Sequence, residues 1–275
     1  MNGFILCYKY KKSGSSEGSG SSSDSDLVSL GILSKPISEF SDSDIGTEVS
    51  IPYSNEGSGI SSPIVFEVVG VNHHTTAEHP KTITLMTKNI IRKASFDAAE
   101  PNNTNSYRKS SGNNRWSVSN IRQWLNSSGA AGSWFTTQHE YDAPPTYADA
   151  PGFLAGFSAN VLQHFTDITN TTNLNNVDGG GTETTVDKVF LPSFTEMGLA
   201  TREGSHLSIR YPDANSRIKQ WNGSDDYYWT RSNYKVMSST SANVFYINAT
   251  GNNGSGSFHT SAATNYGIVP IIVLH

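Results

Sequence analysis

The sequence predicts an α+β domain with two to three short helices, a mixed β-sheet and long C-terminal loops. Short β-branched runs occur along the chain, but they do not alternate regularly with helices as in a doubly wound sheet. Three short segments carry apolar residues or cap signals at helical spacing. Across residues 232–266, 23 of 35 residues are Ser, Thr, Asn, Gly or Tyr, which favours long polar loops.

Composition excludes several classes of protein. The 275-residue chain carries 19 Lys and Arg against 24 Asp and Glu, a formal charge of −5, with only 16% charged residues. Without a basic stripe it should bind neither nucleic acid nor anionic membranes, because phosphate binding needs clustered cations. No apolar run approaches the ~20 residues of a membrane span, and we expect no secretory signal at the start of the chain. The single Cys7 excludes an internal disulfide and a cysteine-based zinc site.

The N-terminal segment has its own organisation. Residues 4–10 are apolar and aromatic, and we expect residues 1–12 either to be disordered or to form an anchoring peptide that docks on a partner. Eleven of the thirteen residues 13–25 are Ser or Gly, which predicts a flexible tether over residues 13–37. The globular domain is expected over residues 38–275.

The first half of that domain carries strand and helix signals. A strand is expected within residues 45–53, and residues 64–71 and 82–87 should pair as a hairpin. Ser117 is positioned to cap a short helix whose apolar face continues to Leu125.

Two more helices and four strands follow. Residues 153–165 have helical apolar spacing, and Ser193 with Glu196 forms a capping-box pattern ahead of a third short helix. The expected strands cover residues 186–191, 227–231, 243–248 and 267–274.

Four ordered motifs carry a family resemblance. They are WSVSNIRQWLN at residues 116–126, DKVFLPS at 187–193 followed by Glu196, YYWTRS at 227–232 and GIVPIIVL at 267–274. The series resembles a domain of unknown function common in Firmicutes and their phages, over about residues 40–275. Val269 stands where the family pattern has Arg, so the ion pair of that Arg is absent here.

The resemblance implies a C-type-lectin-like fold similar to that of formylglycine-generating enzymes. Some relatives look like phage tail or receptor-binding proteins, and others like the variable proteins of diversity-generating retroelements. The motif residues have a mainly structural interpretation as buried aromatic side chains and ion-pair partners: Trp116, Arg122, Trp124, Asp187, Trp229 and Arg231. Shared motifs of this kind argue for the fold rather than for an active site.

The candidates for metal binding are weak. His73, His74 and His79 lie in one loop with Glu78, but neighbouring residues of a strand point to opposite faces, so a solvated turn is the simpler interpretation. Glu100-Pro-Asn102 spells a tripeptide of sugar-binding C-type lectins, but the later calcium ligands are missing. We therefore predict no metal and no cofactor.

The candidates for catalysis are equally weak. The one thiol lies outside the domain, and no serine nucleophile elbow is present. The pair Asp225 and Asp226 could act as acid and base, although a solvated turn explains it more simply. We therefore predict no enzymatic activity.

The C-terminal loops instead have a composition typical of binding surfaces. Tyr supplies rigid contact area, while Ser, Asn and Gly supply adaptable hydrogen bonds. Adenine-directed retroelement mutagenesis would produce the same residue types, and a plain polar loop remains the alternative. The predicted ligand-binding residues are Asn233, Tyr234, Asn243, Tyr246, Asn248, Asn252, Asn253, His259 and Tyr266.

The function expected from these observations is attachment. We predict a phage virion protein (tail, tail fibre or capsid decoration), assembled in the host cytoplasm, that acts as an adhesin on a bacterial surface glycan or protein. Its N-terminal segment would contact other virion proteins, and a homo-oligomer is expected. The alternatives are a purely structural virion component and, less favoured, a formylglycine-generating-enzyme-like modifying enzyme.

Overall fold

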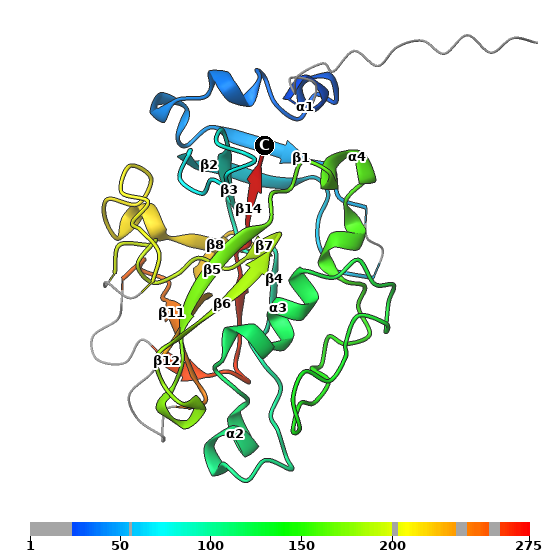
Figure 1. The fold of residues 1–275 in the computed structure, drawn as a ribbon, viewed down its shortest axis with the longest axis vertical. Coiled ribbons are helices and arrows are strands. Elements are labelled where there is room, and N and C mark those ends of the chain that lie inside the picture. Colours follow the sequence, from blue (N-terminus) through cyan, green and yellow to red (C-terminus); the bar gives the residue numbers. More distant parts are fainter. Residues whose placement is uncertain (1–23, 55–56, 200–202, 235–240, 253–258) are drawn as a thin grey trace, which may run out of the picture.

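The computed structural model describes residues 24–54, 57–199, 203–234, 241–252 and 259–275. It shows an α+β protein with few short helices and several sheets (Figure 1). Predicted residue Asn253 and the peptide at residues 1–12 lie outside the described residues. No helix in these ranges is long and apolar enough to cross a membrane.

The first sheet is antiparallel and joins both halves of the chain. Its strand order is β1-β2-β3-β14-β7. The expected 64–71 and 82–87 hairpin is present as β2 paired with β3, and β14 of the extreme C-terminal part lies between β3 and β7. The bounds are β1 (Glu48–Ile51), β2 (Ile64–Val71), β3 (Ile83–Thr87), β7 (Val189–Phe190) and β14 (Ile271–Leu274).

The second sheet is mixed. Its order is β12-β11-β10-β13-β4, and β10 runs parallel to β13 while the other neighbours are antiparallel. The bounds are β4 (Arg92–Ser95), β10 (Tyr228–Asn233), β11 (Asn243–Ile247), β12 (His259–Ser261) and β13 (Asn265–Ile268).

The single strand expected over residues 267–274 is two strands in two sheets. Val269 and Pro270 separate β13 from β14. Pro270 has no N–H to donate to a ladder, which favours a break there. Its carbonyl accepts from the Thr87 N–H at 3.0 Å, which guides the chain into the first sheet. This crossing ties the two sheets together.

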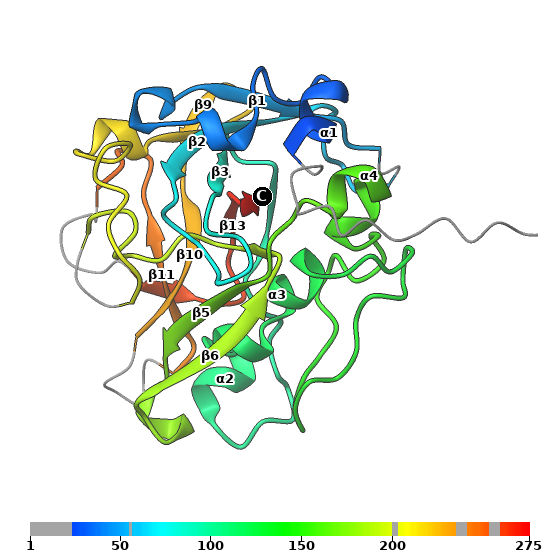
Figure 2. The same cartoon turned by 45° about the horizontal axis from the view of Figure 1, so that its top comes forward.

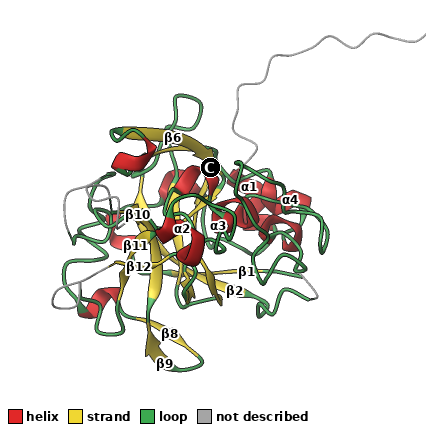
Figure 3. Ribbon diagram, turned by 90° about the horizontal axis from the view of Figure 1, so that it is seen from below, coloured by secondary structure: helices red, strands yellow, loops and turns green. Residues whose placement is uncertain are grey.

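Two hairpins complete the strands. β5 (Ile168–Asn173) pairs with β6 (Thr182–Asp187), and β8 (Lys219–Trp221) pairs with β9 (Ser224–Asp226). Figure 3 shows the β8–β9 hairpin projecting from one side of the molecule. The expected 186–191 strand is interrupted, because β6 ends at Asp187 and β7 begins at Val189.

The helices differ from expectation in detail. The α-helices are α1 (Asp24–Ser29), α2 (Ser106–Ser111), α3 (Asn120–Leu125) and α4 (Ala159–Leu162); the 3₁₀ turns are η1 (Ile37–Glu39), η2 (Asp42–Asp44), η3 (Trp116–Val118), η4 (Phe153–Gly156), η5 (Asn176–Asp178) and η6 (Asn215–Arg217). Ser119 rather than Ser117 caps α3, since its hydroxyl accepts from the Arg122 N–H. α2 was not expected; the Asn105 side chain caps it.

Of the other two helix predictions, the one over residues 153–165 was partly right and the one after Ser193 was wrong. Residues 153–165 form η4 and α4, separated by Phe157 and Ser158 in extended conformation. The end of η4 packs tightly on Tyr53, because a Cβ at Gly156 would lie 2.3 Å from the Tyr53 ring. Ser193 and Glu196 do exchange capping-box hydrogen bonds, but they close a turn instead of opening a helix.

Residues 27–37 of the tether predicted over 13–37 are packed on the domain. Leu27, Ile32, Leu33 and Ile37 are buried in the hydrophobic core. Figures 1 and 2 place α1, α4 and the C-terminus near the same end of the molecule. The packed part therefore includes residues from Leu27 onward.

The core is built around aromatic residues of the motifs. Trp116, Trp124 and Trp229 are fully buried. Phe96 packs between Trp116 and Trp229, with ring centroids 6.1 and 5.9 Å away. Because Trp116 is on η3 and Trp229 on β10, these contacts fix η3 and the following α3 against the second sheet.

Candidate functional site

Three tyrosines from different strands meet on the second sheet. Tyr227 immediately precedes β10, Tyr246 is on β11 and Tyr266 is on β13. Their ring centroids lie 5.3 Å (Tyr227 to Tyr266), 4.9 Å (Tyr246 to Tyr266) and 5.7 Å (Tyr227 to Tyr246) apart. We call these three residues the tyrosine cluster.

Strand register explains why the tyrosine cluster forms. Tyr228 pairs with Gly267 in the parallel ladder, which brings Tyr227 beside Tyr266. Trp229 pairs with Tyr246, and Trp229 shares a face with Tyr227 because side chains alternate along a strand. The buried Trp229 ring lies 5.0 Å from Tyr266 and its Nε1 donates to the Ala94 carbonyl at 2.9 Å. The cluster therefore rests on a rigid base.

The cluster is accessible and polar at its edge. Tyr227 is 39% exposed, while Tyr246 and Tyr266 are half-buried. Partial burial, with Tyr227 close by, raises the pKa of Tyr246. Next to Tyr227, Asp226 accepts from Lys93 at 2.8 Å. Apolar ring faces with hydroxyls at their tips suit sugar rings and protein epitopes.

The structure therefore brings together two predicted residues, Tyr246 and Tyr266, with Tyr227, which the sequence analysis missed. The alternation of Tyr227, Tyr228 and Trp229 was a usable signal, because it places the first and third residues on one face. Tyr234 lies elsewhere: it is half-buried and its ring stacks on Phe245 at 5.7 Å.

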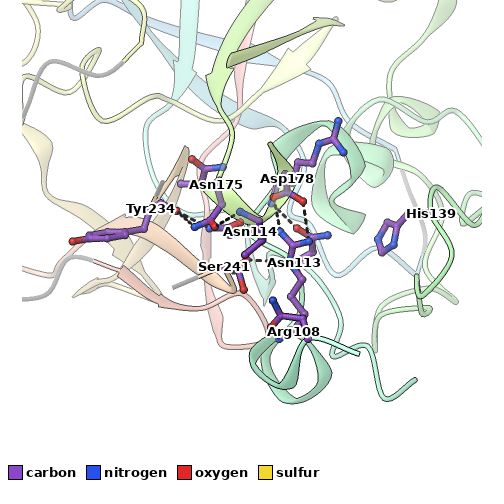
Figure 4. Close-up of polar contacts among 12 residues, drawn as sticks. Arg108, Asn113, Asn114, His139, Asn175, Asp178, Tyr234 and Ser241 are labelled. Atoms are coloured by element: carbon purple, nitrogen blue, oxygen red, sulfur yellow. Dashed lines mark hydrogen bonds and ion pairs between the residues drawn. The ribbon is translucent and has the colours of Figure 1, made fainter. Parts of the chain in front are cut away.

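Two predicted asparagines, Asn233 and Asn243, make structural hydrogen bonds, and the neighbouring Asn114 and Asn175 bond the Tyr234 carbonyl (Figure 4). We call these contacts the amide network. The Tyr234 carbonyl accepts from Nδ2 of Asn114 at 3.1 Å and of Asn175 at 2.7 Å. Asn114 Nδ2 also donates to the Asn243 carbonyl, and the fully buried Asn233 donates to the Asn173 carbonyl at 2.7 Å. The Tyr234 ring points away from this network in Figure 4. These contacts fix the chain on both sides of residues 235–240.

The remaining predicted residues follow β11. Asn248 Oδ1 accepts from the N–H groups of Thr250 and Asn252, both at 3.0 Å, so Asn248 shapes a turn. Asn252 is exposed. His259 begins β12, where its backbone pairs with Phe245.

Each motif arginine pairs with a buried carboxylate. Arg122 Nε donates to Asp187 Oδ1 at 2.6 Å. Arg231 binds Glu196 through both terminal nitrogens, at 2.8 and 2.6 Å, and is 2% exposed. Burial alone would raise the pKa of Glu196, but Arg231 and the nearby His74 outweigh burial and hold it well below 4.5.

The three histidines of the loop at residues 73–79 contact different partners. His74 uses one ring nitrogen toward Thr84 (3.1 Å) and the other toward Glu196 (3.3 Å). His73 contacts Ser205 at 3.3 Å, and the His79 ring stacks on His275 with centroids 3.5 Å apart. Within the described residues, no three His, Cys, Asp or Glu side chains are arranged to hold a metal ion.

The candidate acid–base pair, Asp225 and Asp226, forms polar contacts with neighbouring side chains at the surface. Asp226 pairs with Lys93, and Asp225 accepts from Gln220 at 3.0 Å. The Glu100 carboxylate is fully buried, and among the described residues it belongs to no group of three His, Cys, Asp or Glu side chains that could hold a metal ion.

Comparison with known proteins gives a family match without a functional one. The family described as "Domain of unknown function (DUF6273)" matches residues 81–275. The match begins later than residue 40, where the motif resemblance was expected to start. No curated protein and no solved structure matches the chain.

Proposed function

The chain belongs to the DUF6273 family, and from that premise we propose that it is a non-enzymatic binding protein that attaches to a bacterial surface glycan or protein through the tyrosine cluster. The single observation that carries this proposal is the convergence of Tyr227, Tyr246 and Tyr266 on one accessible face. Stacked aromatic side chains at a protein surface bind ligands at low entropic cost.

The setting that we propose is a phage virion of Firmicutes hosts, with a C-type-lectin-like fold. The short helices, a mixed sheet and long loops support the fold. The N-terminal segment would contact other virion proteins, and the protein would act as a homo-oligomer assembled in the host cytoplasm. The weakly acidic surface supports a partner other than nucleic acid or an anionic membrane.

The rival proposal is a purely structural virion component. The amide network favours it for one part of the surface, because Asn233, Asn243 and Asn175 hold the chain rather than face solvent freely. Tyr246 and Tyr266 also pack against the core, but Tyr227 beside them is 39% exposed, and this accessible aromatic face is why we favour attachment.

A cell-binding experiment tests the proposal. Fluorescently labelled full-length protein is titrated onto intact Firmicutes and Bacteroides cells, beside a Y227A/Y246A/Y266A triple variant and the single Y227A. The matched control is Y107A, because Tyr107 is also exposed (46%) but lies on α2. Saturable binding lost in the triple variant, reduced in Y227A and kept in Y107A supports attachment.

Two results would overturn it. If the folded wild-type protein binds none of these cells, the structural-component proposal takes its place. If binding survives in both folded tyrosine variants, the cluster is not the site. Far-UV circular dichroism establishes folding, and Y227A provides the informative case if the triple variant unfolds, since Tyr227 is the most exposed of the three.

A further inference from the structure

A cavity of about 460 Å³ lies between the β8–β9 hairpin, which projects from the molecule in Figure 3, and the segment that leads into β2. Its volume falls within the roughly 300–1,000 Å³ of ordinary ligand pockets. The buried Ile64 and Ile90 line it together with the half-buried Ile60 and Trp221. Its polar lining residues are Glu48, Ser61, Lys88, Asn89, Gln220 and Asn222. None of these residues belongs to the tyrosine cluster.

Trp221 sets this cavity apart from the rest of the surface. The chain has five tryptophans. Four of them are at most 3% exposed and contact another aromatic ring: Trp116, Trp124, Trp134 and Trp229. Trp221 is half-buried, and within the described residues it contacts no aromatic ring and its Nε1 donates no hydrogen bond. Because a buried Trp normally packs its ring and pairs its N–H, the Trp221 side chain has both to offer to a ligand.

A tight turn holds Trp221 at the cavity. Trp221 ends β8 and pairs with Ser224 of β9, and the two residues between them, Asn222 and Gly223, have φ values of 51° and 81°. Such a two-residue turn with positive φ joins hairpin strands closely. The Ile90 N–H donates to the Gln220 carbonyl at 3.0 Å, which fixes the hairpin beside the cavity.

The other open groups at the cavity are neutral. The side chains of Ser61 and Asn222 make no hydrogen bond to any described residue and are exposed. Asn89 uses only its Oδ1, which accepts from the Gln220 N–H at 3.3 Å, so its amide nitrogen stays open. Side-chain amides donate and accept, and a hydroxyl does both as well. The cavity therefore combines an apolar part with neutral hydrogen-bonding groups.

The charged residues at the cavity do not favour a charged ligand. Lys88 and Glu48 pair with each other, and their side chains are 44% and 52% exposed. An ionised ligand would have to compete with this internal partner and with water, so it would gain little from either residue. The ligand that suits this cavity is therefore neutral.

We propose that this cavity binds a neutral N-acetylated amino sugar. The C–H side of the sugar ring packs on Trp221. The methyl of the acetamido group is buried against Ile64 and Ile90, and its N–H and carbonyl pair with the side-chain amides of Asn89 and Asn222. A sugar without the acetamido group lacks both contacts, and a free amino sugar brings a charge that finds no open partner here. This site is independent of attachment through the tyrosine cluster.

Ligand-observed NMR titration of the full-length protein tests this proposal. The probes are N-acetylglucosamine and N-acetylgalactosamine, compared with glucose, glucosamine and N-acetylalanine methylamide, which has the amide groups but no sugar ring. We expect at least one acetamido sugar to bind roughly tenfold more tightly than each of the three comparison compounds.

Two variants locate the site. W221A should weaken binding of the acetamido sugar by roughly tenfold or more. N222G should weaken it by about fivefold, and it keeps the turn because glycine adopts positive φ readily. The matched controls are Y107A and N102G, since Tyr107 and Asn102 are exposed and do not line the cavity. Far-UV circular dichroism establishes folding, and N222G decides the matter if W221A unfolds.

The outcomes separate this site from the tyrosine cluster. Acetamido-sugar binding that is lost in W221A, weakened in N222G and kept in both controls and in Y227A/Y246A/Y266A supports the proposal. Binding lost in the tyrosine triple but kept in N222G overturns it and assigns the sugar to the tyrosine cluster. Unchanged binding in folded W221A or in N222G also overturns it, as does binding of glucose, glucosamine or the methylamide as tightly as the acetamido sugars. Absence of acetamido-sugar binding overturns it too, and leaves the cell-attachment proposal untouched.

Discussion

The carboxylate of Asp187 offers the sharpest test of how the family motifs hold the fold. It is 1% exposed and accepts four hydrogen bonds. The donors are Trp116 Nε1 at 3.1 Å, Arg122 Nε at 2.6 Å, Asn170 Nδ2 at 3.0 Å and Thr185 Oγ1 at 2.6 Å. Trp116 is on η3, Arg122 on α3 and the others on β5 and β6, so one side chain joins three parts of the chain.

Two substitutions separate the charge from the neutral acceptors. D187N keeps one oxygen, which can face the three neutral donors that all contact Oδ2, while its amide nitrogen faces Arg122. Arg122 is 23% exposed and can turn to water, so we expect a loss of about 2 kcal/mol in unfolding free energy. D187A leaves three buried donors unpaired as well, and we expect about 3–5 kcal/mol.

Urea denaturation followed by circular dichroism measures both losses as shifts in midpoint at constant m-value. D167A is the control, because Asp167 is 57% exposed in its pair with Lys188 and should change stability by no more than about 0.5 kcal/mol. A loss below about 1 kcal/mol in D187A would refute the reasoning. Equal losses of unfolding free energy in D187N and D187A would also refute it, because the oxygen kept in D187N would then contribute nothing to stability.

Three further predictions use other buried residues. W124A should cost about 3–5 kcal/mol, measured by thermal or urea unfolding, because Trp124 is fully buried and its Nε1 donates to a carbonyl at 2.9 Å. Because the pKa of Glu196 is lowered in the folded state, its contribution to stability is complete above pH 4.5 and declines as the pH falls below that value. The difference in unfolding free energy between wild type and E196Q should therefore become smaller as the pH falls. A difference that stays constant with pH would contradict this prediction. Burial lowers the pKa of Lys219 to about 8, so the folded state loses this proton at a lower pH than the unfolded state does. Between about pH 8 and 10.5, this difference should raise the unfolding free energy of the wild type as the pH rises, and K219M should lack that increase.

The sequence predicted the strands better than the helices. β2 and β3 are long β-branched runs whose pairing is local, so periodicity and the intervening loop were sufficient. The helices are only four to six residues long, and tertiary contacts decide where they begin and end. Gly156 against Tyr53 shows this most clearly, since that contact joins residues about a hundred positions apart and no local pattern reports it.

The candidate site was predictable only in part, for the same reason. Composition singled out Tyr246 and Tyr266, but it also singled out Asn233 and Tyr234, whose roles depend on partners at Asn173 and Asn175. Residue type alone cannot distinguish an asparagine that faces solvent from one that bonds a distant carbonyl. The parallel pairing of β10 with β13, which assembles the tyrosine cluster, is also non-local.

The central place of β14 has a consequence for biosynthesis. β14 fills the gap between β3 and β7, and Leu274 pairs with Ile83, which lies 191 positions earlier (274 − 83). While the ribosome still holds residues 271–274, β3 keeps an open edge that can pair with other nascent chains. The first sheet can therefore be completed only after residues 271–274 have left the ribosome. A message truncated just before β14 would yield a polypeptide that aggregates rather than a slightly weakened product.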